Sequence, residues 1–147
     1  LFGRFWTFLY HDYCKFTLVL GWFQIIRFLG EVIDFQTMLL VKHLKGCSTI
    51  VLESNHDEKM LRDGPYDWHL KQRILSNQGH LSNIQAVGVI SQIMHPGLTN
   101  LILAHLSEVN NHPEVAKETM LRYLQTINAP TRLIVADQYL HAPLIDV

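Results

Sequence analysis

Four clusters of polar side chains in this 147-residue chain hold the residue types that could do chemistry. Each cluster lies where an apolar segment gives way to a loop, and sites in open α/β sheets gather at the carboxyl ends of strands. The four are Asp34, Glu53 to Asp57, Gly79 to Asn83, and His105 to Asn111. Three of them combine histidine with a nearby or facing Asp or Glu, the ligands that suit Zn or Mn. We therefore expect a metal site, although no cluster has a diagnostic spacing such as HExxH.

The composition bears on the ligands of such a site, on its contact with nucleic acid and on its cellular compartment. Nine histidines are a surplus for this length, and imidazole is both a common metal ligand and the acid-base group tuned to neutral pH. The net charge of −1 gives no global basic field, so any nucleic-acid contact must be local. Two cysteines, Cys14 and Cys47, are too few for a disulfide scaffold, which favours reduced thiols and a cytoplasmic location.

The elements that must position these residues alternate between strand and helix, which predicts a single α/β domain. Ser82 with Gln85 forms a capping box ahead of apolar residues at helical spacing, and Asn55 with Glu58 suggests a shorter capped helix. Phe16 to Ile33 is expected to form two strands that turn at Gly21. Further strands are expected at Thr49–Leu52, Leu101–Leu103, Leu133–Ala136 and Pro143–Ile145, and further helices at Thr37–Leu44, Trp68–Leu75 and from Asn111 to Pro130.

The most apolar segment, Phe16 to Gly30, has only 15 residues, fewer than the roughly 20 that a membrane-spanning helix needs. We therefore expect no membrane partner. The chain begins at Leu1 without an initiator methionine and without a signal-peptide pattern, so we expect a fragment of a longer protein.

Four sequence segments occur in an order that resembles a known family. They are Val51 to Asp57, Gly64 to Ser76, Gly79 to Asn83 and Leu103 to Asn111. Together they resemble the WalJ/YycJ-type branch of the metallo-β-lactamase superfamily, over about Lys42 to Val147. This resemblance implies one half of an αββα sandwich, with a mixed sheet flanked by helices and a two-metal site between the sheets. It also implies exonuclease or phosphodiesterase activity on DNA, as in a branch whose relatives include ribonuclease Z.

The resemblance assigns roles to five residues. His105 corresponds to a metal-binding histidine, Asp34 to the aspartate that bridges two ions, and His11 to a further ligand. His80 corresponds to a histidine that acts on the scissile phosphate or leaving oxygen, oriented by Glu53. Two divalent ions, Zn or Mn, would activate water for an in-line displacement. The HxHxDH motif of the family's first half is absent, so the missing N-terminal half or a second copy is an expected partner.

Several residues keep more than one interpretation. His56 and Asp57 could support the site, contact substrate or cap a helix, and His11 could be a polar residue in an aromatic stretch. Lys71 and Arg73, with Tyr66 and Trp68, could bind phosphate and stack bases, or could form a surface helix with Trp68 in the core. Four further histidines are expected to be surface residues or caps, namely His43, His95, His112 and His141.

Two other functions remain open. A hydrolase with the same fold could instead act on another ester or a lactam. Such an enzyme would differ in its substrate but not in its metal. Alternatively, the chain could be a truncated domain without catalytic activity, which the absent HxHxDH motif favours.

Overall fold

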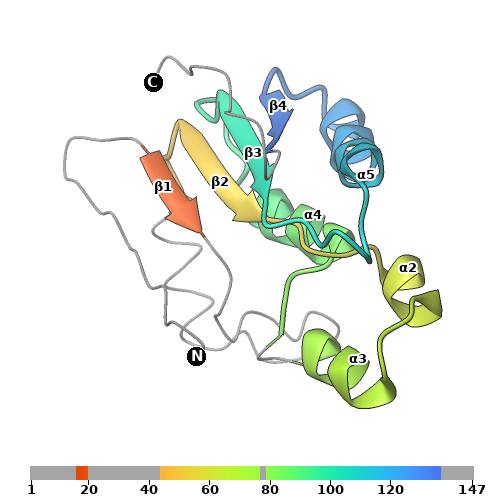
Figure 1. The fold of residues 1–147 in the computed structure, drawn as a ribbon. Coiled ribbons are helices and arrows are strands. Elements are labelled where there is room, and N and C mark those ends of the chain that lie inside the picture. The colour runs from red at the N-terminus through yellow and green to blue at the C-terminus, as the bar shows by residue number, and fades with distance from the viewer. Residues whose placement is uncertain (1–15, 20–43, 77–78, 137–147) are drawn as a thin grey trace.

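A parallel sheet with helices on one side organises the chain. The computed structural model describes residues 16–19, 44–76 and 79–136 (Figure 1). Its strands are β1 (Phe16–Val19), β2 (Thr49–Glu53), β3 (Asn100–Ala104) and β4 (Arg132–Val135), in the order β1-β2-β3-β4. All three strand pairs are parallel. The α/β class is confirmed, whereas the expectation of a mixed sheet is wrong for the described strands.

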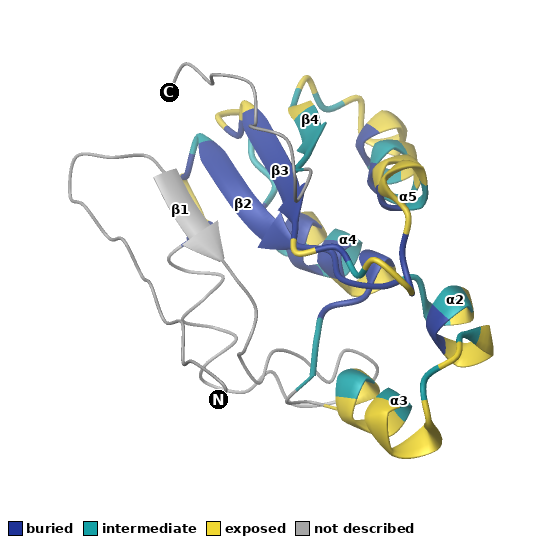
Figure 2. Cartoon of the chain, viewed as in Figure 1, coloured by how far each residue is buried: buried dark blue, intermediate teal, exposed yellow. Residues whose placement is uncertain are grey.

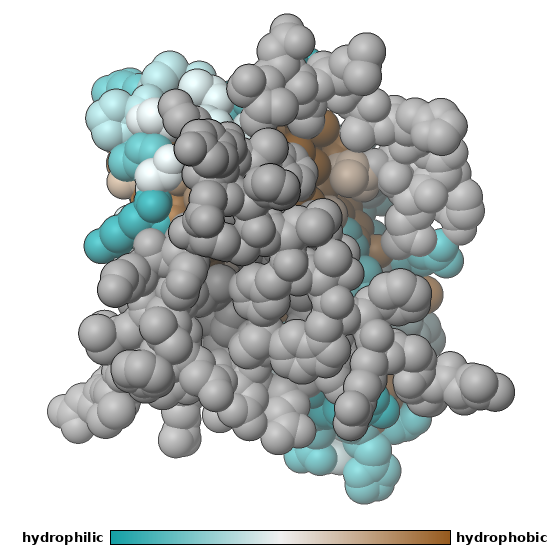
Figure 3. Space-filling model, turned by 90° about the vertical axis from the view of Figure 1, so that its left-hand side faces the viewer, coloured by the Kyte–Doolittle hydropathy of each residue, from teal (hydrophilic) through white to brown (hydrophobic). Residues whose placement is uncertain are grey.

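The main core lies between the sheet and two helices, α4 (Asn83–Ile93) and α5 (Pro113–Thr126). Because side chains alternate along a strand, Ile50, Leu52, Leu101 and Leu103 face these helices, while Val51 and Ile102 belong to a separate cluster. Strands β2 and β3 are buried along their whole length (Figure 2). Figure 3 shows hydrophobic described residues gathered in the upper half of this view and hydrophilic ones at its upper left and lower edges. This core holds the carboxyl ends of β2 and β3 in place.

The N-termini of three helices show which residues cap them. The Ser82 and Gln85 capping box is present at α4 as predicted. The short helix α2 (Glu58–Asp63) is capped by Asp57 rather than by Asn55, because the Asp57 carboxylate accepts the backbone N–H groups of Lys59 and Met60. At α5 the N-cap residue is His112, without a side-chain capping bond, and Pro113 occupies the first turn.

Helix α3 (Trp68–Leu75) has the predicted bounds and is capped by Asp67, but none of its residues is buried. It projects from the body of the molecule together with α2 (Figure 1). The alternative that places Trp68 in the core is therefore wrong, because 66% of its surface is exposed.

Other expectations fall outside the described residues. These are the second strand of the Phe16 to Ile33 hairpin, the Thr37–Leu44 helix apart from Leu44, and the Pro143–Ile145 strand. Among the described residues, no helix is both long and apolar enough to span a bilayer.

Candidate functional site

Three loops meet at the carboxyl edge of the sheet. Glu53 is the last residue of β2 and pairs in register with Ala104, the last residue of β3, so His105 begins the loop beside Glu53. The loop that carries His80 joins the same edge, since the backbone N–H of Asn55 donates to the carbonyl of Leu81 at 2.8 Å. We call these three loops, residues 53–57, 79–83 and 105–111, the polar edge.

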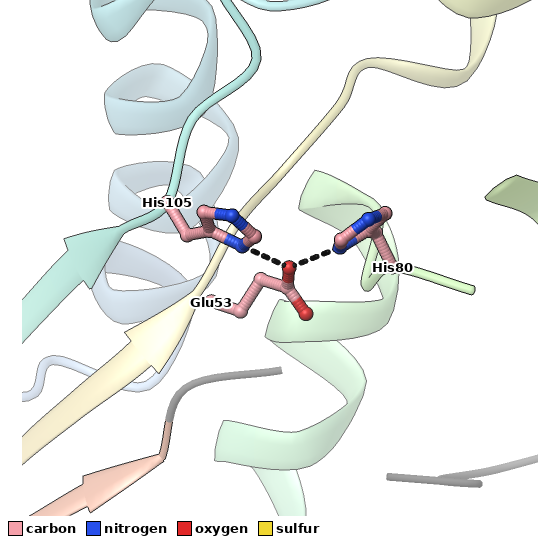
Figure 4. Close-up of side chains that lie close together, drawn as sticks. All are labelled: Glu53, His80 and His105. Atoms are coloured by element: carbon pink, nitrogen blue, oxygen red, sulfur yellow. Dashed lines mark hydrogen bonds and ion pairs between the residues drawn. The ribbon is translucent and has the colours of Figure 1, made fainter. Parts of the chain in front are cut away.

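One carboxylate oxygen joins two histidines in the polar edge (Figure 4). Glu53 Oε1 lies 2.7 Å from His80 Nδ1 and 2.6 Å from His105 Nδ1, and the two rings meet edge to face with centroids 5.1 Å apart. Glu53 is only 1% exposed, and its Oε2 accepts the backbone N–H of Leu81 at 3.3 Å. Because an ionised carboxylate only accepts, each Nδ1 is assigned the proton, which leaves both Nε2 atoms facing away from Glu53.

The electrostatics support an ionised Glu53. Burial is the largest single influence and raises the pKa of Glu53, but the hydrogen bonds from His105 and His80 and the fields of both rings outweigh it, so the pKa is lowered. The hydrogen bond to Glu53 raises the pKa of His105. The interactions of ionised Glu53 therefore stabilise the folded protein at pH values above the ordinary pKa of a glutamate. This stabilisation is lost as the pH falls through the lowered pKa of Glu53. The interactions of protonated His105 stabilise the folded protein fully at pH values below the ordinary pKa of a histidine. This stabilisation is lost as the pH rises through the raised pKa of His105.

The donor set fits a divalent metal ion. Glu53, His80 and His105 each offer one ligand atom, and these atoms lie within 4.8 Å of one another. Ligand atoms around tetrahedral zinc are about 3.3 Å apart, given bonds of about 2.0–2.1 Å. The shorter distances from Glu53 Oε1 to the two Nδ1 atoms are those of hydrogen bonds. The arrangement therefore suits binding through Nε2, with Glu53 behind the rings to fix their orientation.

A buried amide network holds the loops together. Ser54 Oγ donates to Asn83 Oδ1 at 2.7 Å, Asn83 Nδ2 donates to Asn111 Oδ1 at 2.9 Å, and Asn111 Nδ2 donates to the Ser54 carbonyl at 2.8 Å. Sequence reasoning gave Asn83 and Asn111 no site role. Both lie in the same polar segments of the sequence as the candidate histidines, which is a signal for a role near the site. The sequence alone could not predict which groups their side chains would bond.

Two of the expected site residues lie outside the described residues, and a third, His56, is buried. His11 and Asp34 lie outside the described residues, so their expected meeting with His105 stays a prediction. His56 is 1% exposed, and neither of its ring nitrogens has a hydrogen-bond partner in the described structure, so it presents no surface for substrate. Burial, the main influence, lowers the pKa of His56 to about 4.

Two basic residues of the expected substrate contact lie on or near α3. Lys71 Nζ donates to the backbone carbonyl of Arg62 at 2.7 Å, and Arg73 is exposed in the last turn. Both lie on α3, outside the three loops of the polar edge. The last turn of α3 is nevertheless tied to the site, because the backbone N–H of His80 donates to the carbonyl of Ile74 at 3.1 Å.

Comparison with known proteins identifies relatives for part of the chain. It is 40% identical over 82 residues to exodeoxyribonuclease YycJ of Bacillus anthracis, which covers 56% of this chain and 31% of that protein. It is 43% identical over 74 residues to exodeoxyribonuclease WalJ of Streptococcus pneumoniae, which covers 50% of this chain and 28% of that protein. No protein-family profile and no solved structure matches the chain. Over about half its length the chain is therefore related to YycJ and WalJ, of which it spans less than a third.

Proposed function

We propose that this chain contributes the Glu53, His80 and His105 part of a metal-dependent site that hydrolyses phosphodiester bonds in DNA. The observation that carries the proposal is the single buried oxygen, Glu53 Oε1, that orients both imidazoles. Two histidines held by one carboxylate, each with Nε2 turned outward, suit metal binding and proton transfer at adjacent positions. The names of the relatives, exodeoxyribonucleases, supply the substrate class.

In this proposal His105 binds a divalent ion through Nε2, and His11 and Asp34 are the further ligands from this chain. Two ions, Zn or Mn, would supply Lewis-acid chemistry and a reactive water at neutral pH. The role of Glu53 is to keep His105 in one ring orientation with Nδ1 protonated, so that Nε2 is the ligand atom. Carboxylates behind metal-binding histidines commonly have this effect.

His80 is proposed to handle the proton of the leaving oxygen. When Nε2 of His80 is also protonated, the ring becomes a cation that the buried Glu53 carboxylate stabilises at 2.7 Å. It could then donate from Nε2 to the leaving alkoxide or stabilise its charge. General acid catalysis of this kind contributes about 10²- to 10⁴-fold in rate.

Helix α3 is proposed to guide the substrate strand. Trp68 is exposed and could stack on a base, while Lys71 and Arg73 could contact phosphates. Because the carbonyl of Ile74 accepts the His80 N–H, a strand held along α3 would lie close to the proposed acid.

The rest of the site is proposed to come from a region outside these 147 residues. The chain spans less than a third of the relatives' length, and the HxHxDH motif is absent from it. A preceding half of a metallo-β-lactamase fold, or a second copy of the chain, would supply the missing ligands. A cytoplasmic location accords with a DNA substrate.

The test is cleavage of end-labelled DNA with Mn by a polypeptide that also carries the HxHxDH region. His105→Ala should abolish turnover, whereas His112→Ala, an exposed histidine at the N-cap of α5, should leave it unchanged. Unchanged turnover in the His105→Ala variant would refute the proposal. A thioester and a lactam tested on the same preparation separate the other hydrolase classes, and no bound Zn or Mn would support a non-catalytic domain.

A further inference from the structure

The backbone of His105 has an unusual conformation. Its φ angle is 59°, in the left-handed region that is unfavourable for a residue with a side chain. This angle sets the direction in which the Cβ atom leaves the chain just beyond β3. The 2.6 Å bond from His105 Nδ1 to Glu53 therefore depends on a backbone conformation that the surrounding structure must hold.

Asn55 makes the contact that holds this conformation. Its side-chain Nδ2 donates to the backbone carbonyl of His105 at 2.9 Å. Its own backbone N–H donates to the carbonyl of Leu81, and its carbonyl accepts the N–H of Ser107, each at 2.8 Å. Asn55 thus bonds to both loops that carry the candidate histidines, and it is 9% exposed.

We infer that Asn55 is a positioning residue, which fixes the His105 backbone so that Nδ1 faces Glu53 and Nε2 is presented for binding. The functional meaning of this inference rests on the proposed role of His105 as a metal ligand. The geometric part does not, because it concerns only the orientation and tautomer of the His105 ring.

A purely structural role for Asn55 would give a different result, and Asn111 provides the matched comparison. Asn111 also donates from a buried side-chain amide to a backbone carbonyl, that of Ser54 at 2.8 Å. Removal of either amide leaves one backbone carbonyl without that donor, and removal of the Asn111 amide also breaks its bonds to Asn83, so Asn111→Ala is the more disruptive change. Of these two asparagine side chains, only that of Asn55 is bonded to His105.

The experiment uses ¹⁵N NMR of the histidine rings in the 147-residue chain, with His105→Ala to assign the His105 signals. In the wild type and in Asn111→Ala, His105 should show a protonated Nδ1 and an unprotonated Nε2 at alkaline pH, above its raised pKa. In Asn55→Ala, the His105 signals should shift toward a mixture of both tautomers. Unchanged His105 signals in Asn55→Ala, or equal shifts in Asn111→Ala, would overturn the inference.

A second variant protects the test against a folding defect. Asn55→Asp keeps the side-chain shape, but its carboxylate cannot donate to the His105 carbonyl. It should disturb the His105 signals at least as much as Asn55→Ala, and wild-type signals in a folded Asn55→Asp protein would also overturn the inference.

Zinc titration followed by the same signals links the positioning to binding. Both Asn55 variants should bind Zn about 10-fold more weakly than the wild type, whereas Asn111→Ala should not. A wild-type chain that binds no Zn would count against the proposed function, while the tautomer comparison would still decide the role of Asn55.

Discussion

In most proteins apolar side chains are buried and polar ones are exposed. The polar edge and the α2–α3 segment, residues 58–75, depart from this pattern in opposite directions. In the polar edge, side chains such as Glu53, Ser54 and Asn83 are buried and hydrogen-bonded. In the α2–α3 segment, large apolar side chains such as Trp68 and Leu75 are exposed. A buried polar group is costly unless it has partners, whereas an exposed apolar one costs folding little. Changes in the polar edge should therefore affect both stability and chemistry, and changes on α3 should affect binding alone.

The largest effect is expected for Glu53→Gln. This change removes the charge that accepts two short hydrogen bonds, and hydrogen bonds to charged groups contribute about 1.5–3 kcal/mol each. The free energy of unfolding in urea should fall by about 3 kcal/mol, and DNA cleavage by the completed enzyme by about 10²-fold or more. Glu118→Gln is the control, because its ion pair with Arg122 is exposed and should matter by less than about 0.5 kcal/mol. Equal effects of the two changes would contradict the comparison.

Gly79→Ala should have the next largest effect. A Cβ atom at Gly79 would overlap the carbonyl oxygen of Ile74, a backbone group that cannot move without shifting α3 from His80. We expect a loss of about 2 kcal/mol in stability, as for other overpacked sites. The matched change Gly88→Ala in α4 meets nothing within 4 Å and should stabilise the protein by about 0.5–1 kcal/mol. A neutral Gly79→Ala would show that the spacing between α3 and His80 is adjustable.

The buried His56 should make stability depend on pH. Its folded pKa of about 4 is below the ordinary 6.5, so between these values the unfolded chain binds more protons and stability falls as the pH is lowered. From pH 7 to pH 5 the wild type should lose about 2 kcal/mol from this residue, as measured by urea unfolding at both pH values. His56→Leu should lose correspondingly less. An identical pH dependence would place the acid sensitivity on other groups, such as Glu53.

The smallest effect on stability is expected for Trp68→Ala. Because Trp68 is exposed, the change should alter the free energy of unfolding by less than about 0.5 kcal/mol, whereas Leu124→Ala in the core of α5 should cost about 3 kcal/mol. If Trp68 stacks on a base, affinity for single-stranded DNA should fall about 10-fold in a fluorescence-anisotropy titration. Unchanged affinity would remove α3 from the substrate path.

Local sequence signals predicted many of the elements. The bounds of α3 and the capping box of α4 followed from residues within one helical turn, and β2 and β3 followed from short apolar runs. The start of α2 did not, because Asn55 and Asp57 are both suitable caps. Asp57 caps the helix, while the Asn55 amide bonds to His105, a partner 50 residues away.

By itself, the sequence determined the α/β class, most helix and strand positions, and the histidines and carboxylate worth considering for a site. Only the tertiary structure decided that the described strands are parallel, that Trp68 is exposed, and that Glu53 serves both His80 and His105. The physical reason is distance along the chain. Caps and helical faces depend on residues three or four positions apart, whereas Glu53 meets its two histidines across 27 and 52 residues. Which groups meet at that range depends on the register of β2 against β3 and on the packing of α4, and these are properties of the whole core.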